Sequence, residues 1–126
     1  MSNVQYQISN KKYDIHDRIF EFIIKVIELT KVLPKNAQNL IIISQILRSV
    51  TSMGANDQEA DGASSRKDFL HCYTIVRKEG KETVFWLRLI QKTNPMVSIV
   101  ESLILEGNEI VAIISTIIKN TNRLNI

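Results

Sequence analysis

Residues 45–69 read QILRSVTSMGANDQEADGASSRKDF, and they contain the end of one predicted helix and the start of the next. Apolar residues recur in the first part at the spacings of three and four that are typical of an amphipathic helix, at Ile46, Val50 and Met53. Gly62 is typical of a helix C-terminus, and Ser65 with an aspartate three positions later resembles a capping box. The stretch therefore predicts two helices joined by a turn near residues 63 and 64, and so short a connection makes them antiparallel.

The composition favours one domain made of long helices. The chain has 126 residues, of which 44% are hydrophobic and 23% charged, and these are ordinary globular proportions. It contains only four Gly and two Pro, whereas a β-sandwich needs a turn signal about every 8–12 residues. A chain of this length buries roughly two-thirds of the surface that its unfolded form exposes. A second domain is not expected.

Four segments show helical periodicity, and their boundaries can be assigned. Their expected extents are residues 14–33, residues 36 to about 62, residues 65–93, and residue 94 onward. Asp14 is a suitable N-cap, and Pro34 ends the first helix because proline cannot donate to the helical ladder. The fourth helix is expected to begin at Asn94-Pro95, as a cap followed by proline at the first helical position. Short connections then predict an all-α fold, an up-down-up-down antiparallel four-helix bundle.

The bundle domain is expected to cover residues 13–120. Residues 1–12 form either a flexible tail or an arm that docks on another subunit, and residues 121–126 form a C-terminal tail. The N-terminus lacks the apolar run of a signal peptide, and no run approaches the roughly 20 apolar residues of a membrane span. One cysteine, Cys72, excludes a disulfide within the chain. We expect a cytoplasmic protein that does not associate with a membrane.

The second helix carries an apolar stripe and, opposite it, a polar one. The apolar stripe comprises Ile43, Ile46, Leu47, Val50 and Met53, with Gly54 on the same side. The polar stripe comprises Gln45, Arg48, Ser49, Ser52, Asn56 and Glu59. A solvated face is one interpretation of the polar stripe. Its small serines and its lack of lysine favour a second interpretation, a surface that another part of the protein or another copy covers.

A carboxylate, Glu79, is expected on the apolar side of the third helix. If the turn lies near residues 63 and 64, the antiparallel arrangement places Arg48 opposite Glu79 and Gln45 opposite Glu82. A buried carboxylate needs a partner, so we expect an ion pair between Arg48 and Glu79. The candidate residues of a polar network or subunit interface are Arg48, Ser52, Asn56, Glu59, Glu79 and Glu82.

The other side of the third helix is basic. Residues 63–93 contain seven Lys or Arg and three Asp or Glu, a balance of +4, whereas the whole chain has a net charge of +3. The basic side chains that fall within a sector roughly 80° wide are Arg66, Arg77, Lys81, Arg88 and Lys92, with Tyr73 among them. Such a face can follow a phosphate backbone. The alternative is a solvated face, or one that contacts an acidic protein.

No catalytic, cofactor-binding or metal-binding residues are assigned, and we do not expect an enzyme. His16 and His71 are far apart in the sequence, and Cys72 adjoins only His71. The chain lacks a glycine-rich phosphate loop. Three acidic residues of the second helix could hold a cation, but they spread around the helix instead of converging; they are Asp57, Glu59 and Asp61.

Two residue series resemble a known family over residues 13–119. The first is Arg48, Ser49, Ser52, Asn56 and Glu59, and the second is Lys78, Glu79, Glu82, Thr83, Trp86 and Leu87. They resemble the four-helix bundle proteins encoded by intervening sequences in bacterial large-subunit ribosomal RNA genes, most of which have no established function. The chain departs from the usual pattern at Ala60, where glycine is common, and at Gly80, where alanine or serine is more usual.

The resemblance implies an all-helical bundle that assembles into a ring, typically a homopentamer. It also extends to the accessory variability protein of diversity-generating retroelements, a pentameric barrel with a basic surface that works with a reverse transcriptase and its RNA. A homo-oligomer that binds RNA or DNA through the third helix, with a reverse transcriptase or another protein as partner, is therefore the first expectation. The alternative is a structural or protein-interaction module that binds no nucleic acid.

Overall fold

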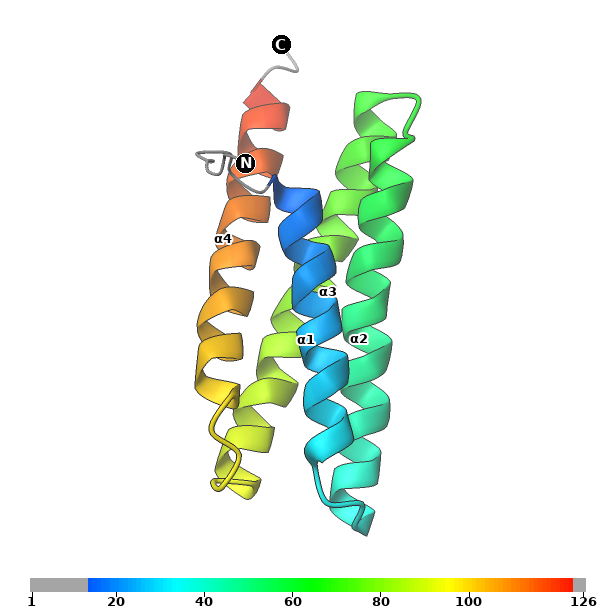
Figure 1. Cartoon of the computed structure of the whole chain (residues 1–126). Coiled ribbons are helices and arrows are strands. Elements are labelled where there is room, and N and C mark those ends of the chain that lie inside the picture. Colours follow the sequence, from blue (N-terminus) through cyan, green and yellow to red (C-terminus); the bar gives the residue numbers. More distant parts are fainter. Residues whose placement is uncertain (1–13, 124–126) are drawn as a thin grey trace, which may run out of the picture.

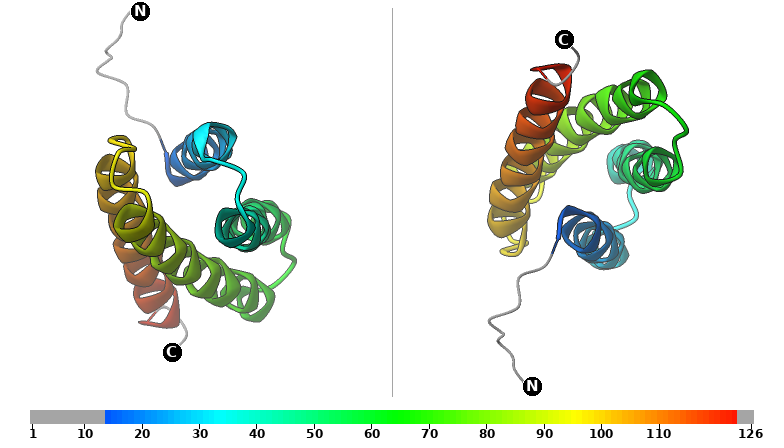
Figure 2. Two further views of the ribbon diagram at one scale, coloured as in Figure 1. Left: turned by 90° about the horizontal axis from the view of Figure 1, so that it is seen from below. Right: turned by 90° about the horizontal axis from the view of Figure 1, so that it is seen from above.

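The computed structural model describes residues 14–123, which form four α-helices and no strand (Figure 1). The helices are α1 (Ile15–Val32), α2 (Ala37–Asp61), α3 (Arg66–Thr93) and α4 (Val100–Arg123). Consecutive helices run in opposite directions, and α2 and α4 each pack against both α1 and α3. End-on views show the helices in chain order around a shared interior (Figure 2). The predicted all-α, up-down-up-down four-helix bundle is confirmed.

Local capping explains where the first three helices begin. The side chain of Asp14 accepts a hydrogen bond from the Asp17 N–H at 2.9 Å, and Ser65 accepts one from the Asp68 N–H at 3.1 Å. Asn36 caps α2 in the same way. These side chains satisfy backbone N–H groups that have no partner within the first helical turn. Gly62 follows the last residue of α2, as the sequence indicates.

The predicted start of the fourth helix is wrong. Asn94 caps the C-terminus of α3, where its N–H donates to the Ile90 carbonyl at 2.7 Å, and α4 begins at Val100. Pro95 disfavours the helical conformation in the residue before it, and Asn94 has φ −135° and ψ 62°. The side-chain amides of Asn94 and buried Asn39 donate to each other's oxygens at 2.9 and 3.1 Å. This amide pair joins the first turn of α2 to the α3–α4 connection at one end of the bundle.

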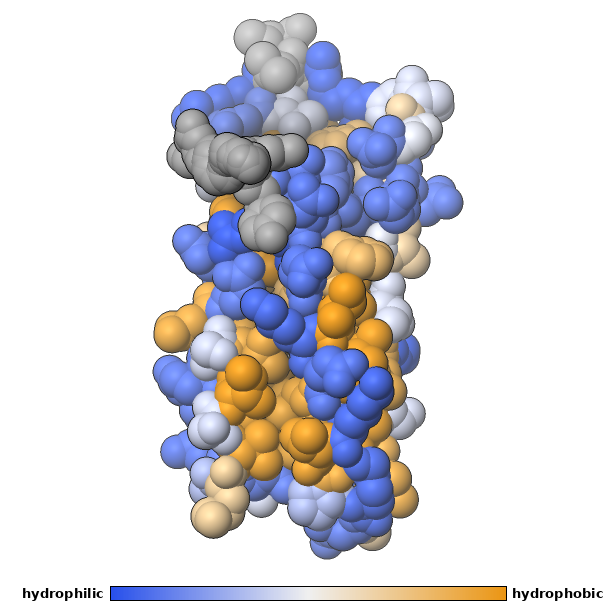
Figure 3. Space-filling model, in the orientation of Figure 1, coloured by the Kyte–Doolittle hydropathy of each residue, from blue (hydrophilic) through white to orange (hydrophobic). Residues whose placement is uncertain are grey.

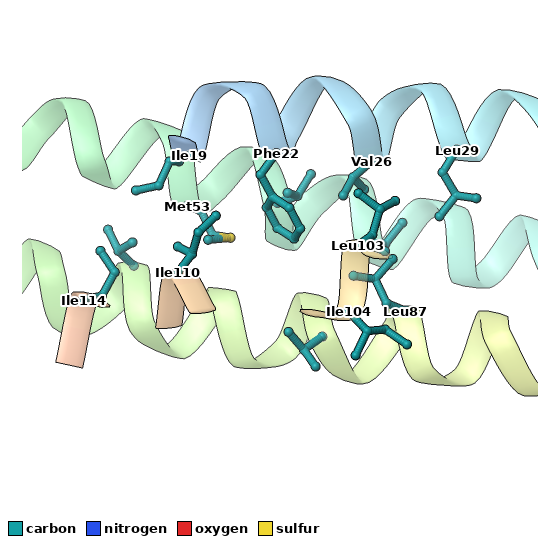
Figure 4. Packing of buried hydrophobic residues seen from close by; sticks show 14 of the residues in the cluster. Ile19, Phe22, Val26, Leu29, Met53, Leu87, Leu103, Ile104, Ile110 and Ile114 are labelled. Carbon is teal, nitrogen blue, oxygen red and sulfur yellow. The ribbon is translucent and has the colours of Figure 1, made fainter. Parts of the chain in front are cut away.

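Aliphatic residues from all four helices form the core. Ile19, Phe22, Val26 and Leu29 project from α1 toward the interior, where Figure 4 shows Met53 of α2 and Leu103 of α4. The buried face of α2 differs from the predicted stripe, because Ile43 and Leu47 are only half-buried. The polar residues Asn39, Ser49 and Asp57 are buried on this helix. Their partners lie outside α2, on other helices for Ser49 and Asp57 and on the two neighbouring connections for Asn39, so the hydrophobicity of α2 alone misplaces its buried face.

Two glycines allow close contacts between helices. A Cβ atom on Gly80 of α3 would lie 2.9 Å from Val111 Cγ2 of α4 and 3.3 Å from Met53 Cε. A Cβ atom on Gly54 of α2 would lie 2.6 Å from Ile23 Cδ1 of α1. All three distances are shorter than ordinary carbon contacts. Gly54 therefore lies where α1 packs closely against α2.

The surface combines charged and apolar regions. Hydrophobic residues gather over the lower half of the face that α1, α2 and α4 share (Figure 3). Large apolar side chains that are more than 60% exposed include Phe20, Val32, Ile41 and Leu105. Within residues 14–123, no helix combines the length and apolar character that crossing a bilayer requires.

Candidate functional site

Arg48 lies between two carboxylates of α3. Its Nη1 donates to Glu79 Oε1 at 3.3 Å, and its Nη2 donates to Glu82 Oε2. The Glu79 side chain is 10% exposed, whereas that of Arg48 is 48% exposed. The ion pair expected between Arg48 and Glu79 is therefore present, with Glu82 as a second acceptor for the guanidinium. The arrangement follows from the antiparallel register of α2 and α3.

Arg48 and Glu82 shift each other's pKa values. The hydrogen bond to Glu82 and the nearby Glu79 charge raise the pKa of Arg48 above its ordinary value. Desolvation pushes the pKa of Glu82 upward, but hydrogen bonds from Trp86 Nε1, at 3.2 Å, and from Arg48 outweigh it, so this pKa is lowered. Both groups are ionised at neutral pH, and the cluster presents a half-exposed guanidinium at the α2–α3 edge.

The remaining residues of the predicted polar stripe do not join this cluster. Ser49 is completely buried and shares a 2.8 Å hydrogen bond with Thr83 of α3. Asn56 is half-buried and donates to the Ser52 carbonyl one turn earlier on α2 at 3.0 Å. Glu59 is exposed. The stripe is thus divided into a buried interhelical contact at Ser49, a charged edge at Arg48, and a polar surface from Ser52 onward.

A second polar cluster, absent from the sequence-based hypothesis, surrounds Asp57. The Asp57 side chain is almost fully buried, and it contacts His16 Nδ1 of α1 at 2.9 Å and accepts from the Tyr73 hydroxyl of α3 at 2.7 Å. His16 Nε2 also lies 3.8 Å from Asp61 Oδ1. Tyr73 is 1% exposed and belongs to this cluster, so its assignment to the basic face is wrong. The register that pairs Arg48 with Glu79 also brings Asp57 near Tyr73, and this was the signal available in the sequence.

The contacts of Asp57 shift the pKa values of both partners. The hydrogen bond to Asp57 is the main reason why the pKa of His16 is raised, and burial opposes it. Burial is the main reason why the pKa of Tyr73 is raised, with the hydrogen bond to Asp57 as the next cause. Among residues 14–123 no group of three or more His, Cys, Asp or Glu side chains could hold a metal ion. Because His16, Asp57 and Tyr73 come from three different helices, the cluster connects α1, α2 and α3 at the end of the bundle opposite the Asn39–Asn94 pair.

The five predicted basic residues lie along the outer side of α3, but they are not equivalent. Arg66, Lys81, Arg88 and Lys92 are exposed, and Arg77 is half-buried beside α4. Arg88 and Lys92 border a hollow of about 220 Å³, whose other lining residues are Phe85, Leu89 and Gln91. Sequence reasoning missed Phe85, whose ring is 51% exposed and packs edge-on against Trp86 at 4.8 Å. Two cations and an accessible aromatic ring therefore border the same hollow.

Arg77 borders a different hollow, between α3 and α4. Its volume is about 550 Å³, and its lining residues are Arg77, Ser115, Ile118, Lys119, Asn122 and Arg123. Lys119 and Arg123 were not predicted, because the sequence does not show how α4 is rotated against α3. Their spacing of four residues, which places them on one face of a helix, was the available signal.

These features define a class: an antiparallel helical bundle with one basic side and partly exposed apolar surface, with polar clusters that connect its helices. The chain belongs to the 23S rRNA-intervening sequence protein family, whose family model matches residues 11–116. It is similar to the crystal structure of a protein of unknown function from the S23 ribosomal protein family of Bacteroides thetaiotaomicron. The two share 36% sequence identity and a TM-score of 0.77, over 84% of this chain and 99% of the other. Comparison with curated proteins finds no match.

Proposed function

We propose that this chain is a non-enzymatic, homo-oligomeric protein that binds RNA or DNA through the outer side of α3. The observation that carries the proposal is the hollow that Arg88, Lys92 and the exposed ring of Phe85 line together. Cations that neutralise phosphates supply most of the affinity for nucleic acid, and an exposed ring offers a surface on which an unpaired base stacks. Lys81 extends the same charged surface along α3.

Lys81, Arg88 and Lys92 are not neutralised by carboxylates of the described residues. Across residues 14–123, Lys81, Arg88 and Lys92 form no ion pair with a carboxylate. By contrast, Arg18 contacts both Glu106 and Glu109, at 2.7 and 2.8 Å. A phosphate backbone is one partner that supplies the missing negative charge. Repetition of α3 around an oligomer would multiply the effect.

Self-assembly is proposed from the exposed apolar surface together with the family's ring-forming members. The side chains of Phe20, Val32 and Ile41 are each more than 60% exposed, and exposed apolar surface of this kind marks interaction sites. The resemblance suggests a homopentamer, located in the cytoplasm, with a reverse transcriptase or another protein as partner. The half-exposed guanidinium of Arg48 would lie at the edge of such an interface.

The same exposed apolar side chains also support an alternative function for the protein. A structural or protein-interaction module would use Phe20, Val32 and Ile41 to bind a partner and would leave α3 solvated. Such a module predicts assembly without affinity for RNA or DNA. Nucleic-acid binding is therefore the property that separates the two functions.

The test is the salt dependence of binding to labelled RNA and DNA, measured by fluorescence polarisation. The variant Arg88→Glu/Lys92→Glu should bind more weakly, and its slope of log affinity against log salt should fall by about 1.4 to 1.8, since each phosphate contact contributes about 0.7 to 0.9. The matched control Lys25→Glu/Lys31→Glu changes two exposed cations of α1 by the same total charge. If the parent protein does not bind at low salt, or if the two variants weaken binding equally, the proposal is wrong.

A further inference from the structure

The hollow between α3 and α4 has the lining of an anion-binding site. Arg77 of α3 and Lys119 and Arg123 of α4 supply three positive charges, and Ser115 and Asn122 add a hydroxyl and an amide that can donate hydrogen bonds. No Asp or Glu lines it, and Ile118 supplies the one apolar side chain. We propose that this hollow binds a phosphate group.

The three cations have no carboxylate partner among residues 14–123. Lys119 and Arg123 are four residues apart on one helix, a spacing at which like charges destabilise the helix. Arg18 and Arg48, in contrast, each contact two carboxylates. The bundle therefore neutralises these two arginines internally and leaves three cations facing one hollow. A bound anion removes the repulsion between them.

The cations are presented by rigid elements. Arg77 follows completely buried Val76 on α3, and Lys119 follows Ile118, which is buried on α4. One turn from Arg77, the absence of a side chain on Gly80 lets α4 approach, with Val111 against the glycine. A guanidinium on such a support recognises phosphate by a pair of parallel hydrogen bonds, and a lysine adds a point charge. The site thus requires little ordering of backbone when the anion binds.

The phosphate has two potential sources that share this chemistry. It belongs either to the backbone of a bound nucleic acid or to a small phosphate compound. The volume of about 550 Å³ gives room for groups attached to the phosphate as well. Because Arg77 also belongs to the basic side of α3, the first source rests on the proposed function, and it would extend the nucleic-acid path from α3 onto α4. The second source does not depend on it.

Two measurements on the full chain test the site, with Lys119→Gln/Arg123→Gln as the variant and Lys25→Gln/Lys31→Gln, at two exposed cations of α1, as the control of equal charge. In the first, pyrophosphate is titrated at constant ionic strength and followed by amide chemical shifts. Saturable shifts should centre on Ser115 and Asn122, and the affinity should fall at least five-fold in the variant but not in the control. Circular dichroism melting verifies that both variants are folded.

The second measurement repeats the salt titration with labelled single-stranded RNA. If the backbone is the source, the variant lowers the slope of log affinity against log salt by about 1.4, two contacts at about 0.7 each. An effect on pyrophosphate alone supports a small phosphate compound. If RNA does not bind while pyrophosphate saturates at this hollow, the proposed function fails and the phosphate site stands. If the variant behaves like the parent in both measurements, or if the pyrophosphate shifts are spread over the basic surface without saturation, the site is refuted.

Discussion

At the scale of single residues, Glu79 depends on one cation that solvent also reaches. Its carboxylate is 10% exposed and its ion-pair partner is Arg48, whose guanidinium also binds Glu82. A buried charge that loses its partner carries an uncompensated desolvation cost. The consequences of removing Arg48 and of removing the whole pair are therefore different.

We predict that Arg48→Met lowers the urea midpoint of unfolding and that Arg48→Met/Glu79→Leu recovers a substantial part of the loss. The single variant leaves the Glu79 carboxylate without a cation, whereas the double variant replaces the pair by apolar groups. Equilibrium urea denaturation of parent, both single variants and the double variant forms the complete cycle. A single variant as stable as the parent would show that Glu79 does not need this partner.

His16 gives the bundle a dependence on pH. The groups that face it are Asp57, Asp14 and Asp61, and the hydrogen bond to Asp57 is the largest cause of its raised pKa. The folded protein therefore keeps the His16 proton at pH values at which the unfolded chain, with an ordinary pKa near 6.5, has released it. This stabilisation is fully present below pH 6.5 and is lost as the pH rises through the folded pKa.

We accordingly expect the free energy of unfolding to decrease between about pH 6 and pH 8. Urea denaturation across this range measures it, and the NMR titration of the His16 ring gives the folded pKa directly. His16→Gln should remove this pH-dependent step, while His71→Gln, a change at an exposed residue of α3, should keep it. A flat profile in the parent between these pH values would contradict the expectation.

At the scale of elements, the contact of α3 with α4 is set by Gly80. Alanine is a better helix former than glycine by about 1 kcal/mol. Its Cβ atom, however, would lie 2.9 Å from Val111 Cγ2, and overpacking typically costs about 1–3 kcal/mol. Valine has a stiff side chain, so the contact is relieved by a movement of the helix or by a strained rotamer.

We predict that Gly80→Ala destabilises the protein by up to about 2 kcal/mol, the overpacking cost of about 1–3 kcal/mol less the gain of about 1 kcal/mol in helix propensity. In a Val111→Ala background the same change should be neutral or stabilising, because the obstructing methyl group is gone. Thermal or urea unfolding of the four proteins gives the comparison. If Gly80→Ala stabilises the parent, α4 is free to move away and the close contact does not constrain it.

At the scale of the whole molecule, the exposed apolar residues bear on the state of assembly. We expect a solution mass that is a multiple of the 14.4 kDa chain, five-fold if the resemblance to ring-forming proteins holds. Phe20→Glu/Ile41→Glu places two charges on exposed apolar positions of α1 and α2 and should reduce that mass. Light scattering coupled to size exclusion measures both proteins. A parent that is monomeric at micromolar concentration would exclude assembly through this surface.

The predictable parts of the fold were those determined by chemistry close in the sequence. Asp14 and Ser65 were recognised as helix starts because a cap binds a backbone group three positions away. Asn94 was misassigned, because the partner of its side chain, Asn39, lies 55 positions earlier. The family resemblance supported the same architecture independently of these boundaries.

The site was predictable to the extent that helix register determines it. Counting residues from the turn located the contact of Arg48 with Glu79, but the burial of Asp57 also depends on α1, which the register of α2 and α3 does not place. The hollow at Arg77 depends on the rotation of α4 about its own axis. The residue pattern of α4 does not indicate how this helix is rotated relative to α3, so Lys119 and Arg123 were missed.

The Asn39–Asn94 pair and the His16–Asp57–Tyr73 cluster lie at opposite ends of a core rich in isoleucine, leucine and valine. Volume-conserving exchanges among branched aliphatic side chains cost a core little, whereas a slide of one helix past another by a turn, about 5.4 Å, would move Gly54 and Gly80 away from the side chains that they accommodate. The same slide would separate both sets of buried polar partners. During evolution the core residues between these two sets of polar contacts can therefore be exchanged for other aliphatic residues while the alignment of the helices stays fixed.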